Sequence, residues 1–238
     1  MTGRVHGAKP SFLGRLALDA VAVGLLLVAL AYYWLENAAH EWIGTGIFGL
    51  VIAHNVFNRR WWGGLTTPRR TAHGLLDRAL TVGLLALVLA LLLSSLMISQ
   101  TVFGFLQWGG GVSARQVHSW AAYGVVVCVA VHLGFRWQRV MATARSALRL
   151  EGESTARAGV LRVVAAAIAA YGFKSSFVME VGTKLALQTS LEWWDFGASV
   201  AGFFLHWVSI VGLYVFVTHY VLRCLQARQR KAIPDAAY

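Results

Sequence analysis

Long apolar runs separated by short polar or basic segments are the dominant pattern of the chain. The runs cover about residues 16–35, 40–57, 79–98, 117–135, 163–178 and 198–222. A helix needs about 20 mostly apolar residues to cross the hydrocarbon core of a bilayer, and no alternating strand pattern competes with that reading. The pattern therefore predicts an all-α, polytopic transmembrane helical bundle. Its first four spans form a core, and one or two further spans follow toward the C-terminus.

The expected bundle is a single integral membrane domain over residues 1–238. Its expected parts are a cytoplasmic lead (1–15), a four-helix core (16–137), a cytoplasmic connection (138–162), C-terminal helices (163–225) and a cytoplasmic tail (226–238). No small-residue cleavage site follows the first apolar run, so that run is interpreted as an uncleaved helix. Lys174 interrupts the fifth run, which spans fully only where this lysine snorkels to the far surface.

Composition and charge distribution agree with a membrane protein. The chain is 58% hydrophobic and 13% charged, with a mean hydropathy of +0.60, which excludes an ordinary soluble domain. The net charge of +11 raises the question of nucleic acid. With six crossings and a cytoplasmic N-terminus, however, every lysine and arginine except Arg115, Lys174 and Lys184 lies on the cytoplasmic side. The basicity is thus explained by topology, and membrane lipid rather than nucleic acid is expected around the chain.

Four histidines stand out within the apolar runs. His40 and His54 are fourteen positions apart, and so are His118 and His132. Fourteen helical steps rotate to about 40° short of four turns and rise about 21 Å, so each pair lies on one stripe near opposite ends of a helix. Both helices are expected to run in the same direction. His40 should therefore match His118 in depth, and His54 should match His132.

Two facing pairs of imidazoles suit a flat metal-containing ligand, and heme is the ligand that takes one imidazole from each side. Cys128 and Cys224 form no CxxCH motif, so any heme is held without a thioether bond, as in heme b. A single histidine in a membrane span is more often a hydrogen-bonded core residue, but the repeated spacing favours two hemes. Zinc or copper remains a rival, with Glu36 and Glu41 as further candidate ligands.

Other polar residues near these histidines have two interpretations. Arg59, Arg60 and Arg136 follow the second histidine of each pair by about one turn, and Arg115 precedes His118. They are candidate partners for heme propionates or ordinary positive-inside anchors. His206 and His219 are thirteen apart, about 140° short of four turns, and do not share a face well. They either hydrogen-bond within the bundle or line a quinone pocket.

The segments HEWIGTGIFGLVIAHNVFNRRWW and RQVHSWAAYGVVVCVAVHLGFRW resemble the signature helices of a known family. This is a bacterial family of small b-type membrane cytochromes, long catalogued as a domain of unknown function and often found near flavinylated or periplasmic redox proteins. The spacing of histidines is also similar to that in the cytochrome b subunit of quinol:cytochrome c oxidoreductases. The small-family resemblance covers most of residues 12–225. It implies two b hemes ligated by the four histidines, in the bacterial inner membrane with both termini cytoplasmic.

The resemblance also implies electron transfer between a quinone pool or a cytoplasmic-side donor and an extracytoplasmic redox protein. On this hypothesis the chain is an electron-transfer subunit of an oxidoreductase rather than a complete enzyme, because two bis-histidine hemes leave no open coordination position. Two alternatives stay open. The first is a non-redox membrane protein, such as a metal transporter lined by histidines or an assembly scaffold. The second is a ferric or quinone reductase that acts alone.

Overall fold

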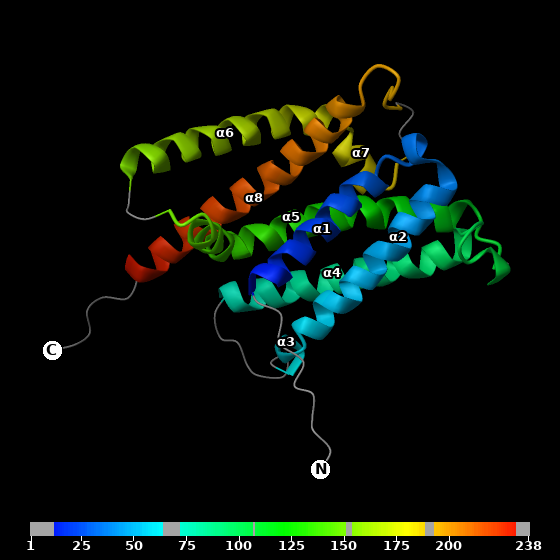
Figure 1. The fold of residues 1–238 in the computed structure, drawn as a ribbon, viewed down its shortest axis with the longest axis horizontal. Helices are drawn as coiled ribbons and strands as arrows, with labels where there is room; N and C mark the ends of the chain where they lie inside the picture. The colour runs from blue at the N-terminus through cyan, green and yellow to red at the C-terminus, as the bar shows by residue number, and fades with distance from the viewer. Residues whose placement is uncertain (1–11, 64–71, 107, 151–153, 189–192, 232–238) are drawn as a thin grey trace, which may run out of the picture.

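The computed structural model describes residues 12–63, 72–106, 108–150, 154–188 and 193–231. These residues form helices and connections without a β-strand, which confirms the all-α fold (Figure 1). The elements are α1 (Phe12–Ala29), α2 (Tyr32–Phe57), α3 (Arg60–Gly63), α4 (Ala72–Ile98), the 3₁₀ turn η1 (Gly104–Leu106), α5 (Val112–Ala147), α6 (Thr155–Val178), α7 (Val181–Leu185) and α8 (Val200–Lys231). Most of the expected N-terminal lead, including His6, and of the C-terminal tail lies outside the described residues.

Four of these helices, α4, α5, α6 and α8, have the length and composition of membrane-spanning helices. α6 is among them because it begins at Thr155, well before the expected residue 163, and so has 24 residues despite Lys174. α1 has only 18 residues, and α2 contains the ionisable residues His40, Glu41 and His54. Neither α1 nor α2 is among the four candidate membrane-spanning helices. The expectation of six crossings therefore stays a prediction, while the apolar, helical character of a membrane protein is established for the four.

The connection expected over residues 138–162 is largely helical. α5 continues ten residues past position 137 to Ala147, and α6 already begins at Thr155. Ser154 starts α6 as an N-cap: its hydroxyl oxygen accepts a hydrogen bond from the Arg157 N–H at 3.2 Å. Basic residues favour helix formation, so the charge run that suggested a connection is compatible with long helices that extend beyond the apolar zone.

The connection between α1 and α2 begins earlier than the sequence suggested. α1 ends at Ala29, and helical structure resumes at Tyr32. The first residue of the link predicted at 36–39 coincides with a break in α2, where Glu36 has the non-helical angles φ 63° and ψ 169° and separates two helical pieces. Ala31, which is fully buried, precedes the first of these pieces. The polar stretch therefore did mark an interruption of the helix, although residues 37–39 are helical.

The helices pack as pairs around α5. α1 packs with α2, α4 with α5, and α8 lies between α5 and α6 (Figure 1). The contact between α6 and α8 is especially close at Gly172, where an added Cβ would lie 2.1 Å from the Ser209 carbonyl oxygen. α2, in contrast, makes at most marginal contact with α4 and α5. This separation leaves room for a cavity between α2 and the α4–α5 pair.

Candidate cofactor-binding cavity

A cavity of about 1460 Å³ runs between α1 and α2 on one side and α4 and α5 on the other. The four histidines singled out by their spacing all line it: His40, His54, His118 and His132. We call the end with His40 and His118 the Glu41 end, and the end with His54 and His132 the Asp19 end. Pockets for one drug-sized ligand have volumes of about 300–1,000 Å³, so this cavity has room for more than one such molecule.

At the Glu41 end the two imidazoles lie close together, and both line the cavity. The ring centres of His40 and His118 are 6.0 Å apart, and the ring planes differ by 66°. Imidazole nitrogens bind metal ions at about 2.0–2.1 Å, and the ring centre lies about 1 Å further, so two imidazoles on opposite sides of one metal ion have centres about 6 Å apart. The separation of the two rings is therefore of the size that two histidines need to hold one metal ion between them.

Hydrogen bonds to the Nδ1 atoms orient these two imidazoles. His40 Nδ1 lies 3.0 Å from the Ala29 carbonyl oxygen. A carbonyl oxygen only accepts, so Nδ1 carries the proton and Nε2 is the nitrogen with a free lone pair. His118 Nδ1 lies 3.3 Å from Ser94 Oγ and 3.4 Å from Ser95 Oγ. Ser94 Oγ donates to the Ala90 carbonyl at 2.7 Å, so it accepts from His118, and the same tautomer follows.

The Glu41 carboxylate fastens α2 to the chain that follows α4. Five donors point at its two oxygens: Asn37 Nδ2 (2.7 Å), Ser99 Oγ (2.6 Å) and the N–H groups of Gln100 (2.8 Å), Thr101 (3.0 Å) and Val102 (2.8 Å). Hydrogen bonds to a charged acceptor are stronger than neutral ones. We call this arrangement the Glu41 clamp. Its carboxylate is fully occupied within the protein, so Glu41 is neither a free metal ligand nor a free docking group.

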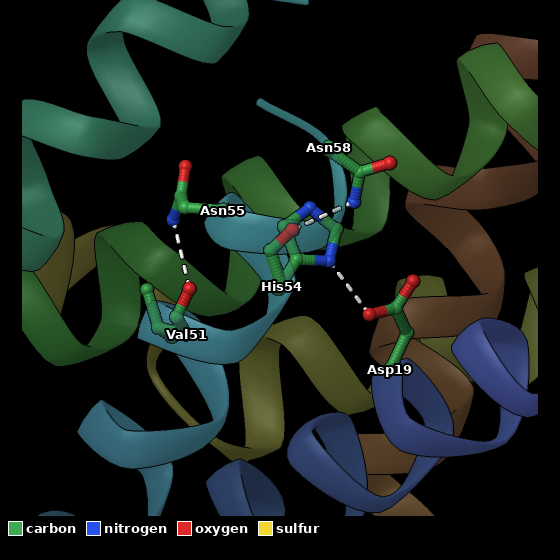
Figure 2. A network of polar contacts seen from close by, with 5 residues as sticks. All are labelled: Asp19, Val51, His54, Asn55 and Asn58. Carbon is green, nitrogen blue, oxygen red and sulfur yellow. Dashed lines mark hydrogen bonds and ion pairs between the residues drawn. The ribbon is translucent and has the colours of Figure 1, made fainter. Parts of the chain in front are cut away.

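At the Asp19 end a carboxylate contacts one of the histidines directly. His54 Nδ1 lies 2.6 Å from Oδ1 of Asp19, which comes from α1 (Figure 2). Both side chains line the cavity. A carboxylate accepts the Nδ1 proton, so Nε2 of His54 is again the free nitrogen. The sequence analysis gave no role to Asp19, which lies 35 residues before His54 with no diagnostic spacing.

His132 differs from the other three histidines. Its Nδ1 is buried and has no hydrogen-bond partner among the described residues. A buried polar atom without a partner costs about 1–3 kcal/mol, and native proteins tolerate few of them outside functional sites. His54, Asp19, Asp77 and Arg136 all lie within electrostatic range of this imidazole. His132 is therefore held by packing on α5 rather than by a hydrogen bond.

The basic residues near the cavity are partly those expected. Arg115 and Arg136 line it, whereas Arg59 and Arg60 are exposed and do not. α2 ends at Phe57, so the chain leaves the helical path before it reaches these two arginines. Arg136 Nη2 donates to both oxygens of the buried Asp77, at 2.9 and 3.1 Å.

Two further arginines at the Asp19 end, Arg15 and Arg139, line the cavity and escaped the sequence analysis. Arg15 Nε is buried without a hydrogen-bond partner among the described residues, so this guanidinium has donor capacity left for an anion. Arg15 lies four residues before Asp19, and this helical spacing is the signal that could have placed both on one face of α1.

The remaining described histidines lie away from the cavity lining. His206 Nδ1 is 2.7 Å from Ser175 Oγ, and its ring stacks on Tyr171 with centres 5.3 Å apart. His219 contacts the Tyr220 ring, and His73 contacts the Phe135 ring. Hydrogen bonding within the bundle, one of the two interpretations of His206, therefore matches its surroundings.

A metal ion bound without a porphyrin usually needs three or more protein ligands. Among the described residues, no group of three or more His, Cys, Asp and Glu side chains is arranged to hold one. At the Glu41 end, one imidazole from α2 and one from α5 have ring centres 6.0 Å apart, so any further donors to a metal ion held there would come from the ligand itself. No protein-family model, curated protein or solved structure matches the chain.

Proposed function

We propose that the protein is a b-type membrane cytochrome subunit that holds two hemes and relays electrons across the bacterial inner membrane. His40 and His118 would ligate one heme, and His54 and His132 the other. The observation that carries the proposal is the cavity between α2 and the α4–α5 pair, because it is lined at each end by one histidine from α2 and one from α5.

The surroundings of the histidines support this assignment. Metal-ligating histidines usually donate their second ring N–H to an oxygen, which fixes the tautomer and the ring orientation. His40 and His54 each have such an acceptor, and His118 has two serine hydroxyls. The ring separation of 6.0 Å at the Glu41 end also matches axial ligation from both sides.

The protein supplies ligands, orientation and charge, while the bound group supplies the redox chemistry. Each heme would supply a one-electron couple, and because two histidines would hold it, transfer of electrons rather than oxygen chemistry is expected. Arg15 and Arg139 at the Asp19 end and Arg115 at the Glu41 end line the cavity and are the candidate donors to heme propionates. Arg136 also lines the cavity, but its guanidinium already donates hydrogen bonds to Asp77.

The partners follow from the position of the two sites on a membrane-spanning bundle. We propose that a quinone pool or a cytoplasmic-side donor supplies the electrons, and that an extracytoplasmic or membrane-associated redox protein receives them. The subunit then acts within a larger oxidoreductase. Its orientation, with both termini cytoplasmic, rests on the positive-inside distribution of lysine and arginine.

A reduced-minus-oxidised visible spectrum of the purified protein, with a pyridine hemochrome assay, tests the proposal. Two b hemes per chain are expected. One heme would restrict the proposal to a single site. A colourless preparation containing divalent metal but no porphyrin would overturn it in favour of the metal transporter, and a colourless, metal-free preparation would favour the scaffold.

A further inference from the structure

The contact between Asp19 and His54 has no counterpart at the other end of the cavity. His40 faces a neutral backbone carbonyl, His118 faces two serine hydroxyls at long distances, and His132 Nδ1 has no partner among the described residues. His54 alone among these four is bonded to a carboxylate, at 2.6 Å (Figure 2). A full negative charge on the back of one imidazole gives the two ends different electrostatics.

We infer that Asp19 is a positioning residue that holds His54 for ligation and lowers the reduction potential of the heme proposed at the Asp19 end. This inference rests on the proposed function. An imidazole that donates its Nδ1 proton to a carboxylate gains imidazolate character and becomes a more basic ligand. A more basic ligand stabilises the ferric state more than the ferrous state, and the potential falls.

Other charged side chains also lie at both ends. At the Asp19 end they are Arg15, Arg136 and Arg139 together with Asp77, which is bonded to Arg136. At the Glu41 end they are Arg115 and Lys184 together with Glu41. These background charges are the same in the wild type and in an Asp19 variant. The effect of Asp19 is therefore read from the shift of one potential and not from the order of the two.

Asp19→Asn separates charge from geometry, because an amide oxygen still accepts the His54 Nδ1 proton. Outer partners of metal ligands typically change metal affinity about 10–100-fold. A tenfold loss of the preference for ferric over ferrous iron is about 59 mV for one electron. We therefore expect the midpoint potential of the heme at the Asp19 end to rise by at least this amount in Asp19→Asn, while the other one stays in place. Asp19→Ala should in addition lower the retention of that heme.

The test is a spectroelectrochemical titration of the heme-loaded full chain, followed by electron paramagnetic resonance of the ferric form. His40→Ala, which should lose the heme at the Glu41 end, assigns the remaining component. Asp19→Asn should then shift that component and its low-spin ferric signal. Asp195→Asn is the matched control, because Asp195 is exposed and bonds only its own turn among the described contacts, and it should change neither potential.

The outcomes distinguish this inference from the proposed function. A wild-type protein without b heme refutes the proposed function itself. Two hemes whose potentials both stay unchanged in Asp19→Asn refute only the role of Asp19. A shift confined to the component that is lost in His40→Ala also refutes it, because the affected heme would then be at the wrong end.

Discussion

The two ends of the cavity are built on different principles. At the Glu41 end a carboxylate stabilises the protein framework: it joins α2 to residues 99–102 and leaves the histidines with neutral partners. At the Asp19 end a carboxylate contacts a histidine that lines the cavity, and the framework depends on the Asp77–Arg136 pair. A carboxylate near a histidine can therefore act in two ways. Glu41 fixes the position of the backbone around its histidines, whereas Asp19 places a negative charge next to the imidazole of His54.

The largest expected effect is the selective loss of one heme. His118→Ala removes a ligand at the Glu41 end, and His132→Ala removes one at the Asp19 end, so each variant should retain about one of two b hemes. The heme content of each variant is first quantified as pyridine hemochrome. A redox titration should then show that the heme left in one variant has a different midpoint potential from the heme left in the other. Identical remaining components would contradict the idea of two separate ends.

The next effect concerns stability at the Asp19 end. Asp77 is almost fully buried, and Asp77→Ala leaves Arg136 without this partner. Breaking one side of a buried ion pair costs about 3–5 kcal/mol, so the free energy of unfolding in detergent should fall by that order. The double variant Asp77→Ala with Arg136→Ala should recover part of the loss, because no unpaired charge remains. If the double variant loses as much free energy of unfolding as the two single variants together, Asp77 and Arg136 are not directly coupled.

A smaller loss is expected when the Glu41 clamp is weakened. Glu41→Gln removes the charge that five donors share, and part-exposed hydrogen bonds to a charged group contribute about 1–3 kcal/mol. The heme at the Glu41 end should dissociate faster to a heme scavenger, while the other heme is unaffected. Glu36→Gln is the matched control, since Glu36 is an exposed glutamate on the same helix. If Glu41→Gln and Glu36→Gln have equal effects on heme dissociation, the Glu41 clamp does not specifically stabilise the Glu41 end.

The smallest effect should come from the serine hydroxyls. Ser94 and Ser95 contact His118 Nδ1 at 3.3 and 3.4 Å, which are long, weak hydrogen bonds between neutral groups. The double variant Ser94→Ala with Ser95→Ala should therefore shift the midpoint potential of the heme proposed at the Glu41 end by less than Asp19→Asn shifts that of the other heme. A larger shift would mean that neutral partners tune the potential as strongly as a carboxylate does.

The local geometry of single helices was accessible from the sequence. The helix-period argument selected four histidines that do line one cavity, because rotation and rise per residue are nearly constant within a helix. The all-helical fold followed from apolar run lengths for the same reason. Arg59 and Arg60 were expected near the cavity from their closeness to His54 in the sequence, but they follow the end of α2 at Phe57 and do not line it.

The relation between helices could not be predicted in this way. Asp19 meets His54 only because α1 and α2 have a particular rotation relative to one another, and four of the five donors to Glu41 come from a loop about sixty residues away. No candidate site residue was selected in α4 from the sequence, yet this helix places Ser94 and Asp77 beside the cavity residues. Such contacts depend on packing, which leaves no periodic signal in one sequence.

The marginal contact between α2 and the α4–α5 pair has a consequence for biogenesis. The α1–α2 hairpin is held by α1 against α5 and α8 and by the Glu41 clamp, so much of what α2 faces is the cavity. On the proposed function, a newly inserted chain would assemble α4, α5, α6 and α8 first and dock the hairpin only as the hemes arrive. Cofactor supply, rather than helix insertion, would then limit the yield of mature protein.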